Sequence, residues 1–175
     1  SEMQMMSAQL GLGVNLAVLD QGSIFYLAHI DAPETPRLFT LIGRHNPLHA
    51  TAMGKILLAC VSDEEREDYL EHLVLHAYTA HTITQVDRLR EELSQAQRQG
   101  WALEMEELAL GRACIACPIR SQTGHVVAAI SISGPLSVLR WNERRGELIN
   151  QTIELADRIS FRLGYITAPR MPRGN

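Results

Sequence analysis

The sequence is poor in the residues that mark several common classes of protein. Its three cysteines are too few, and odd in number, for a disulfide framework, so we expect a reducing, cytoplasmic setting. Sixteen basic residues against 20 acidic ones give a formal net charge of −4, which provides no electrostatic basis for binding nucleic acid. The sequence has neither an apolar run long enough to cross a bilayer nor the pattern of a signal peptide. We therefore expect no membrane partner and no direct DNA contact.

What is present predicts one globular domain. The 175 residues are 46% hydrophobic and 21% charged, which is enough apolar material for a real core. We expect this domain to occupy residues 10–165. Residues 1–9 would be a linker or the remnant of a helix, and residues 166–175, with two prolines and a glycine, a frayed tail.

Strand patterns occur in local pairs, with helical patterns between the pairs. Strands are predicted over residues 14–19, 24–28, 38–41, 101–104, 113–119 and 126–133, and helices over 52–59, 62–72, 86–98 and 145–163. This arrangement favours an α+β fold with an antiparallel sheet over a doubly wound parallel one.

Two cysteines form a C-x-x-C pattern within one predicted strand. Cys114 and Cys117 are three residues apart, and side chains alternate between the faces of a strand, so these two point to opposite sides. They are therefore not expected to form a disulfide or to hold a metal together. Cys114 shares its face with Arg112 and Ala116.

Two serines lie on one face of the last predicted strand. Ser131 and Ser133 are two residues apart, and Ile130 and Ile132 point the other way. One interpretation is a half-exposed sheet with the serines in water. The other is the wall of a small ligand pocket, where a few hydroxyl donors orient a ligand among small apolar groups. No sharp turn and no triad spacing support catalysis by either serine.

Small residues open the helix predicted over residues 52–59, with Thr51 placed to cap it. Its first N–H groups are thus approachable, and a helix N-terminus favours a carboxylate or phosphate. Gly54 and Lys55 lack the preceding glycine-rich loop of a nucleotide site, so nucleotide binding is disfavoured. The alternative interpretation is a capped helix packed closely on the sheet through Gly54, which is compatible with anion binding.

Histidines and glutamates offer weaker signals. The histidines at 72, 76 and 81 lack neighbouring ligands at zinc spacing, so a surface cluster is favoured over a metal site. Among the glutamates at 104, 106 and 107, only Glu104 follows a strand to where a pocket would close. We predict no metal ligand, no cofactor and no catalytic residue.

Three segments in order carry a family resemblance. They are residues 47–55, the pair Glu106 and Glu107 with Gly111 and Cys114, and residues 128–135. The sequence resembles the effector-binding domain of IclR-type bacterial transcription regulators, from about residue 10 to residue 164. The resemblance implies a GAF-like fold, in which helices flank an antiparallel sheet and loops cover a ligand pocket.

The resemblance also implies a set of ligand-binding residues. Carried over position by position, they are Leu38, Asn46, Ala52, Met53, Glu104, Arg112, Cys114, Ser131 and Ser133. In the family, small carboxylates such as glyoxylate or pyruvate accept hydrogen bonds from the helix-start amides and the two serines. Here these donors would be the backbone N–H groups at 52 and 53 and the hydroxyls at 131 and 133.

Three of these positions depart from the family pattern. Asn46 and Arg112 stand where relatives usually carry apolar residues, and Met53 is bulkier than the usual alanine. Arg112 would bind a second carboxylate and favour a dicarboxylate, sugar acid or aromatic acid over glyoxylate. Alternatively, it pairs with Glu104 or points to solvent.

The resemblance predicts a sensor and not an enzyme. Family regulators are dimers or tetramers that bind operator DNA through an N-terminal winged helix-turn-helix, which we expect to lie outside this sequence. A small organic acid effector would shift the oligomer and thereby operator binding. Two alternatives stay open: an oligomerisation module with a vestigial pocket, and a GAF-like enzyme with Cys114 as nucleophile, for which no base is evident.

Overall fold

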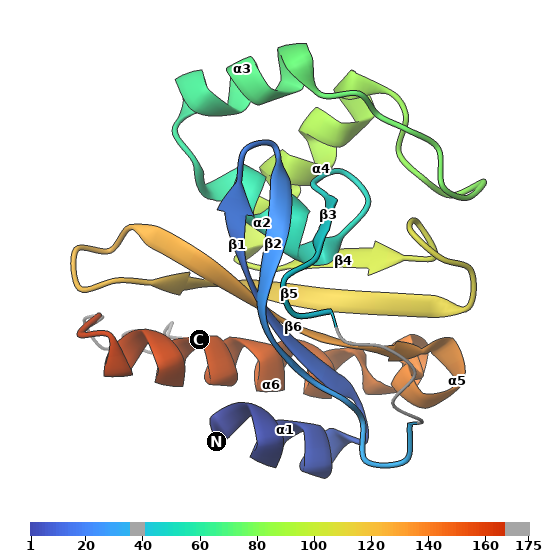
Figure 1. Ribbon diagram of the computed structural model, residues 1–175, viewed down its shortest axis with the longest axis vertical. Coiled ribbons are helices and arrows are strands. Elements are labelled where there is room, and N and C mark those ends of the chain that lie inside the picture. The colour runs from blue at the N-terminus through green and yellow to red at the C-terminus, as the bar shows by residue number, and fades with distance from the viewer. Residues whose placement is uncertain (36–40, 167–175) are drawn as a thin grey trace, which may run out of the picture.

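A six-stranded antiparallel sheet with helices on both faces forms the protein (Figure 1). The computed structural model describes residues 1–35 and 41–166. The strands are β1 (Gly13–Asp20), β2 (Ser23–Ile30), β3 (His45–Pro47), β4 (Ala102–Met105), β5 (Arg112–Arg120) and β6 (Val126–Pro135). The helices are α1 (Glu2–Leu10), α2 (Ala52–Cys60), α3 (Asp63–His72), α4 (Val86–Gln99), α5 (Leu136–Leu139) and α6 (Trp141–Arg162). The predicted α+β class is confirmed.

The sheet separates two hydrophobic clusters. Its strand order is β3-β2-β1-β6-β5-β4, and each neighbouring pair is antiparallel. Helices α2, α3 and α4 cover one face, and α1 and α6 the other (Figure 1). Strand alternation sends Ala116 and Ala129 to the α2 side, and Ile115, Ile130 and Ile132 to the α6 side. The predicted division of the β5–β6 hairpin into two faces is confirmed.

Several predicted helix ends and turns are present. The Thr51 side chain accepts a hydrogen bond from the Gly54 amide at the start of α2, and Ser62 caps α3 in the same way. Gly100 ends α4 with a φ of 84°, a left-handed conformation that glycine adopts without steric cost. Gly22, with the same φ, closes the turn between β1 and β2.

Other elements differ from the sequence prediction. Residues 2–10 form a helix, α1, where a linker or the remnant of a helix was expected. Helix α6 begins at Trp141, before the predicted start at residue 145, and this tryptophan packs with the α6-side cluster. Strand β3 and helix α5 were not predicted, because three- and four-residue elements are too short to show a hydrophobic period. Residues 38–40 of a predicted strand and 167–175 of the predicted tail lie outside the described residues.

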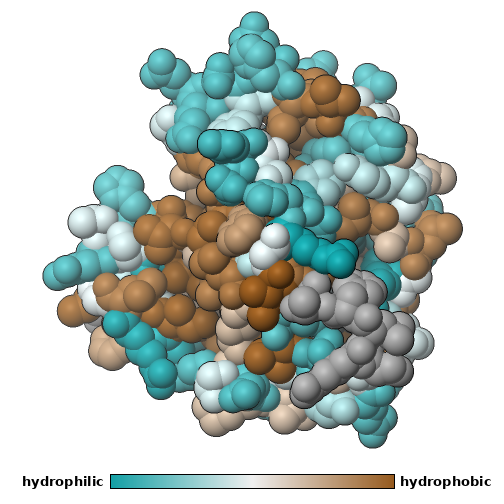
Figure 2. Space-filling view, in the orientation of Figure 1, coloured by the Kyte–Doolittle hydropathy of each residue, from teal (hydrophilic) through white to brown (hydrophobic). Residues whose placement is uncertain are grey.

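The face seen in Figure 1 also carries exposed hydrophobic surface. Figure 2 shows hydrophobic residues in a band across the middle of this face, over the region of the β1–β2 and β5–β6 hairpins. Leu27 on β2 and Val127 on β6 are 46% and 45% exposed. Within residues 1–35 and 41–166, no helix combines the length and apolar character needed to span a membrane.

Candidate functional site

A row of polar and small side chains crosses the sheet beneath α2. Glu104 on β4 lies opposite Cys114 on β5, and Cys114 lies opposite Ser133 on β6. Ser131, two residues before Ser133 on β6, lies opposite Asn15 on β1. These positions share the sheet face that α2 covers, so the register alone brings together residues from four strands.

Asn15 holds the two serine hydroxyls. Its Nδ2 donates to the Oγ atoms of Ser131 and Ser133 at 3.1 Å each, and its Oδ1 lies 2.6 Å from Nδ1 of His29. The other ring nitrogen of His29 lies 2.8 Å from Asp31. Each serine oxygen accepts from Asn15, so the hydroxyl hydrogen can donate to another group. Ser133 also hydrogen-bonds with the Cys114 side chain. Sequence reasoning missed Asn15 and His29; a polar residue within an apolar strand was the available signal.

Glu104 is a buried carboxyl group with one unsatisfied oxygen. Its side chain is 3% exposed, and Oε1 accepts from the Leu108 amide at 3.2 Å. No donor among the described residues reaches Oε2. Burial, and then the nearby charge of Glu107, raise the pKa of Glu104 to about 7. The group is thus an acceptor, close to its titration point at neutral pH, that a ligand donor would satisfy.

Tyr26 and Asn46 border the same region. Asn46, half-buried on β3, donates from Nδ2 to the Tyr26 hydroxyl at 3.1 Å. Burial raises the pKa of Tyr26 to about 12, with smaller contributions from Cys114 and Glu104. The hydroxyl therefore stays protonated and free to donate its hydrogen. Asn46 was among the predicted ligand-binding residues, whereas Tyr26 was not, because its position in an ordinary strand pattern gives no signal.

The first turn of α2 lies against the sheet with two free amides. Thr51 accepts from the Gly54 amide at 3.1 Å, whereas the amides of Ala52 and Met53 donate to no residue among those described. Both residues are nearly fully buried. The positive end of the helix dipole is thus presented inside the fold, where an anion would gain most from it.

Lys55 links α2 to the edge strand β4 through polar contacts. Its ammonium group, on a side chain that is 1% exposed, lies 2.7 Å from Glu107 Oε1 and 3.3 Å from Glu92 Oε2. It also donates to the backbone oxygen of Leu103 at 2.9 Å. From the sequence, Lys55 was a candidate only for a nucleotide-binding loop. Its role as a buried anchor depends on long-range contacts that no local pattern shows.

The remaining predicted residues lie at the edges of this region. Arg112 is exposed at the start of β5, and its charge lowers the pKa of Glu104, against the larger effect of burial. Cys114 packs against the α2-side cluster, and burial followed by Glu104 raises its pKa to about 12. Cys117 lies in the opposite cluster, so the predicted separation of the two cysteines is confirmed. Leu38 lies outside the described residues.

The chain is similar to known regulators over nearly its whole length. The family model described as the C-terminal domain of the bacterial transcriptional regulator IclR matches residues 1–161. The HTH-type transcriptional regulator KdgR of Escherichia coli is 38% identical over 157 residues, which are 89% of this chain and 59% of that protein. The chain therefore spans little more than half of this curated relative.

Solved structures share the fold. The C-terminal domain of Escherichia coli KdgR is 35% identical, with a TM-score of 0.83 and 94% of each chain covered. An IclR homolog from Microbacterium hydrocarbonoxydans, in complex with 4-hydroxybenzoate, is 27% identical, with a TM-score of 0.82, over 93% of this chain and 65% of that one. On this match of sequence and fold, the chain belongs to the family of C-terminal domains of bacterial IclR transcriptional regulators.

Proposed function

We propose that this domain binds a small organic acid that also carries a hydroxyl group. The observation that carries the proposal is the unsatisfied Oε2 of Glu104, because a buried acceptor without a donor is costly until a ligand supplies one. A ligand hydroxyl beside this oxygen meets that need.

The carboxylate of the same ligand has its own donors. The free amides of Ala52 and Met53 are in the first turn of α2, which packs on the same side of the sheet as the two serines. In this proposal the amides and the hydroxyls of Ser131 and Ser133 donate to one carboxylate. Donors that converge on one anion fix its orientation. The relative from Microbacterium hydrocarbonoxydans is complexed with 4-hydroxybenzoate, a molecule with both a carboxylate and a hydroxyl.

A thermal-shift titration tests this proposal with pairs of acids that differ by one hydroxyl. In each pair, we expect the hydroxy acid to raise the Tm of the protein. The matched acid without the hydroxyl should bind at least about tenfold more weakly. Ser131→Ala should weaken binding, whereas Ser94→Ala, an exposed serine on α4, should not. Failure of every acid to stabilise the protein would contradict the proposal.

Arg112 is proposed to select among these acids. It is exposed on β5, two residues before Cys114, and its charge lowers the pKa of both Glu104 and Cys114. In this proposal its guanidinium would pair with a second anionic group of the ligand. Arg112→Gln should therefore weaken binding of dicarboxylates about tenfold and leave monocarboxylates within about twofold. Equal losses for both classes would assign Arg112 no role in selection.

We further propose that the ligand acts through a larger regulator. The chain spans 59% of the length of Escherichia coli KdgR, and operator binding would belong to an N-terminal winged helix-turn-helix. The exposed hydrophobic band in Figure 2 supports self-association, through which the ligand would shift the oligomer. Sedimentation and operator-binding measurements on the full-length regulator, with and without the acid, test this. An unchanged oligomer and operator affinity at saturation would contradict it.

Catalysis by Cys114 is not supported. Burial and the charge of Glu104 keep the pKa of this thiol at about 12, so very little nucleophilic thiolate exists at neutral pH. If the domain were only an oligomerisation module with a vestigial pocket, no acid would change its Tm, and Ser131→Ala would not alter the response to any acid.

A further inference from the structure

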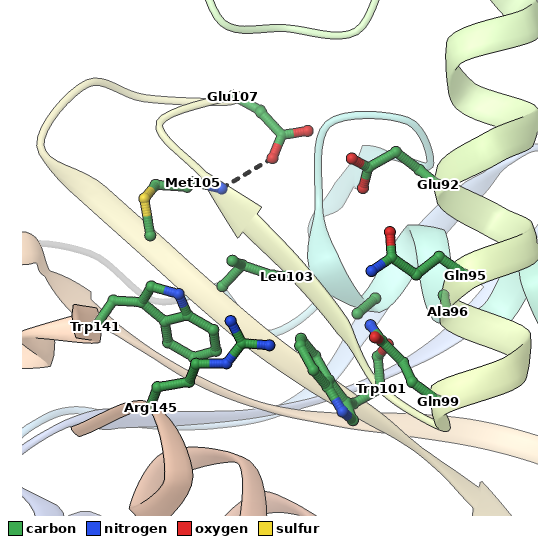
Figure 3. Close-up of a pocket in the computed structure, with 11 residues that line it drawn as sticks. Glu92, Gln95, Ala96, Gln99, Trp101, Leu103, Met105, Glu107, Trp141 and Arg145 are labelled. Atoms are coloured by element: carbon green, nitrogen blue, oxygen red, sulfur yellow. Dashed lines mark hydrogen bonds between the residues drawn. The ribbon is translucent and has the colours of Figure 1, made fainter. Parts of the chain in front are cut away.

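A hollow lies on the outer side of the edge strand β4, away from the row beneath α2. It has a volume of about 280 Å³ and lies between α4, β4 and the start of α6. Its lining includes Gln95, Gln99, Trp101, Met105, Trp141 and Arg145 (Figure 3). The volume is slightly below the range of about 300–1,000 Å³ that is typical of small-molecule sites, so only a small ligand would fit. We call it the tryptophan groove, because both tryptophans of the chain line it.

Arg145 gives the groove an uncompensated positive charge. Its guanidinium carbon lies 5.7 Å from the centre of the Trp101 ring and 5.5 Å from that of Trp141, and Figure 3 shows it between the two rings. No carboxylate within residues 1–35 and 41–166 forms an ion pair with it. The cation–π contacts orient the group, and its N–H donors remain available.

The acidic residues of the groove are already neutralised. Glu107 pairs with Lys55 at 2.7 Å, and Glu92 with Arg88 at 2.9 Å. Arg88 is shared with Glu91 at 3.4 Å, so the charges around the groove are nearly balanced. Arg145 is the lining cation that has no carboxylate partner among residues 1–35 and 41–166, and its free donors favour an anion. The Gln95 and Gln99 side chains extend from α4 towards β4 (Figure 3), and their amides can hydrogen-bond to a polar ligand.

The edge of β4 is closed to an added strand. Lys55 donates to the Leu103 carbonyl, Glu107 accepts from the Met105 amide at 2.8 Å, and Gln99 donates to the Trp101 carbonyl at 2.8 Å. Side chains of the protein thus occupy positions where a neighbouring strand would bond. A compact ligand fits the groove better than an extended peptide does.

We propose that the tryptophan groove is a second small-molecule site, which binds an aromatic carboxylate. The carboxylate would bind the Arg145 guanidinium as a bidentate pair, and the ring would pack against the indoles and the side chain of Met105. This site is separate from the one proposed beneath α2 and does not depend on it.

The indole N–H signals of the chain report on this groove, because the chain contains only Trp101 and Trp141. We would titrate the ¹⁵N-labelled chain with benzoate and follow both signals by NMR. Benzoate should shift them saturably, and benzyl alcohol, which lacks the charge, should bind at least about tenfold more weakly. No saturable shift with benzoate would overturn the proposal.

Three variants distinguish binding in the tryptophan groove from binding elsewhere on the protein. Arg145→Gln should weaken benzoate binding about tenfold or more, and Arg158→Gln, which removes the same charge elsewhere on α6, should change it less than about twofold. Ser131→Ala should leave the indole titration unchanged. An equal effect of the two arginine variants, or loss of the shift in Ser131→Ala, would overturn the proposal. Indole signals that move with protein concentration and not with benzoate would also overturn it, by indicating an interface between copies of the chain.

Discussion

At the scale of single residues, Glu104 links stability to pH. Its folded pKa of about 7 lies above the unfolded value of 4.5, so the folded state binds the proton more tightly. Its contribution to the free energy of unfolding is therefore fully present below pH 4.5 and is lost as pH rises to 7. The loss amounts to about 3 kcal/mol. Glu104→Gln should remove this loss, so that urea unfolding shows a gain in stability over the native chain at pH 8 and little gain at pH 5.

The control for this prediction is Glu91→Gln, an exposed glutamate on α4 whose side chain is 72% exposed. Its effect on stability should be small and almost independent of pH, as for most surface ion pairs. Parallel pH profiles for Glu104→Gln and the native chain would show that Glu104 is not the titrating group.

Residues differ in how far the sequence reveals them. Ser131 and Ser133 were predictable because strand parity fixes their common face. Tyr26 and Lys55 were not, because their roles depend on contacts with distant residues: Asn46 is 20 positions from Tyr26, and Leu103 is 48 positions from Lys55. Burial of Glu104 was likewise invisible, since it is one of three glutamates within four residues, with Glu106 and Glu107.

At the scale of secondary-structure elements, the close approach of the first turn of α2 depends on Gly54. A Cβ atom there would collide with the backbone of Leu48 and with Thr51 Oγ1. Gly54→Ala should therefore destabilise the protein by about 1–3 kcal/mol or more, although alanine has the higher helix propensity. Thermal unfolding measures the change. Binding of the acid should also weaken, since the amides of Ala52 and Met53 are in the same turn.

Gly146 on α6 provides the matched control. No atom lies within 4 Å of a Cβ placed there, so Gly146→Ala should stabilise the protein by about 0.5–1 kcal/mol. Changes in stability of opposite sign for the two substitutions would confirm that packing, and not helix propensity, determines the effect of an alanine at Gly54. A stabilising Gly54→Ala would contradict the tight approach of α2.

The sequence predicted the helix and its cap well, because both are local, whereas β3 and α5 exist only through tertiary contacts.

At the scale of the whole molecule, one sheet joins the two hydrophobic clusters, and unfolding should therefore be a single transition. The two tryptophans lie on the α6 side, whereas the proposed acid site lies beneath α2. A bound acid at 100 times its Kd stabilises the folded state by about 2.7 kcal/mol. The midpoint in urea should rise equally by tryptophan fluorescence and by far-UV circular dichroism. If the fluorescence midpoint stays unchanged while the other rises, the two faces unfold independently, and the sheet does not transmit the effect of the ligand.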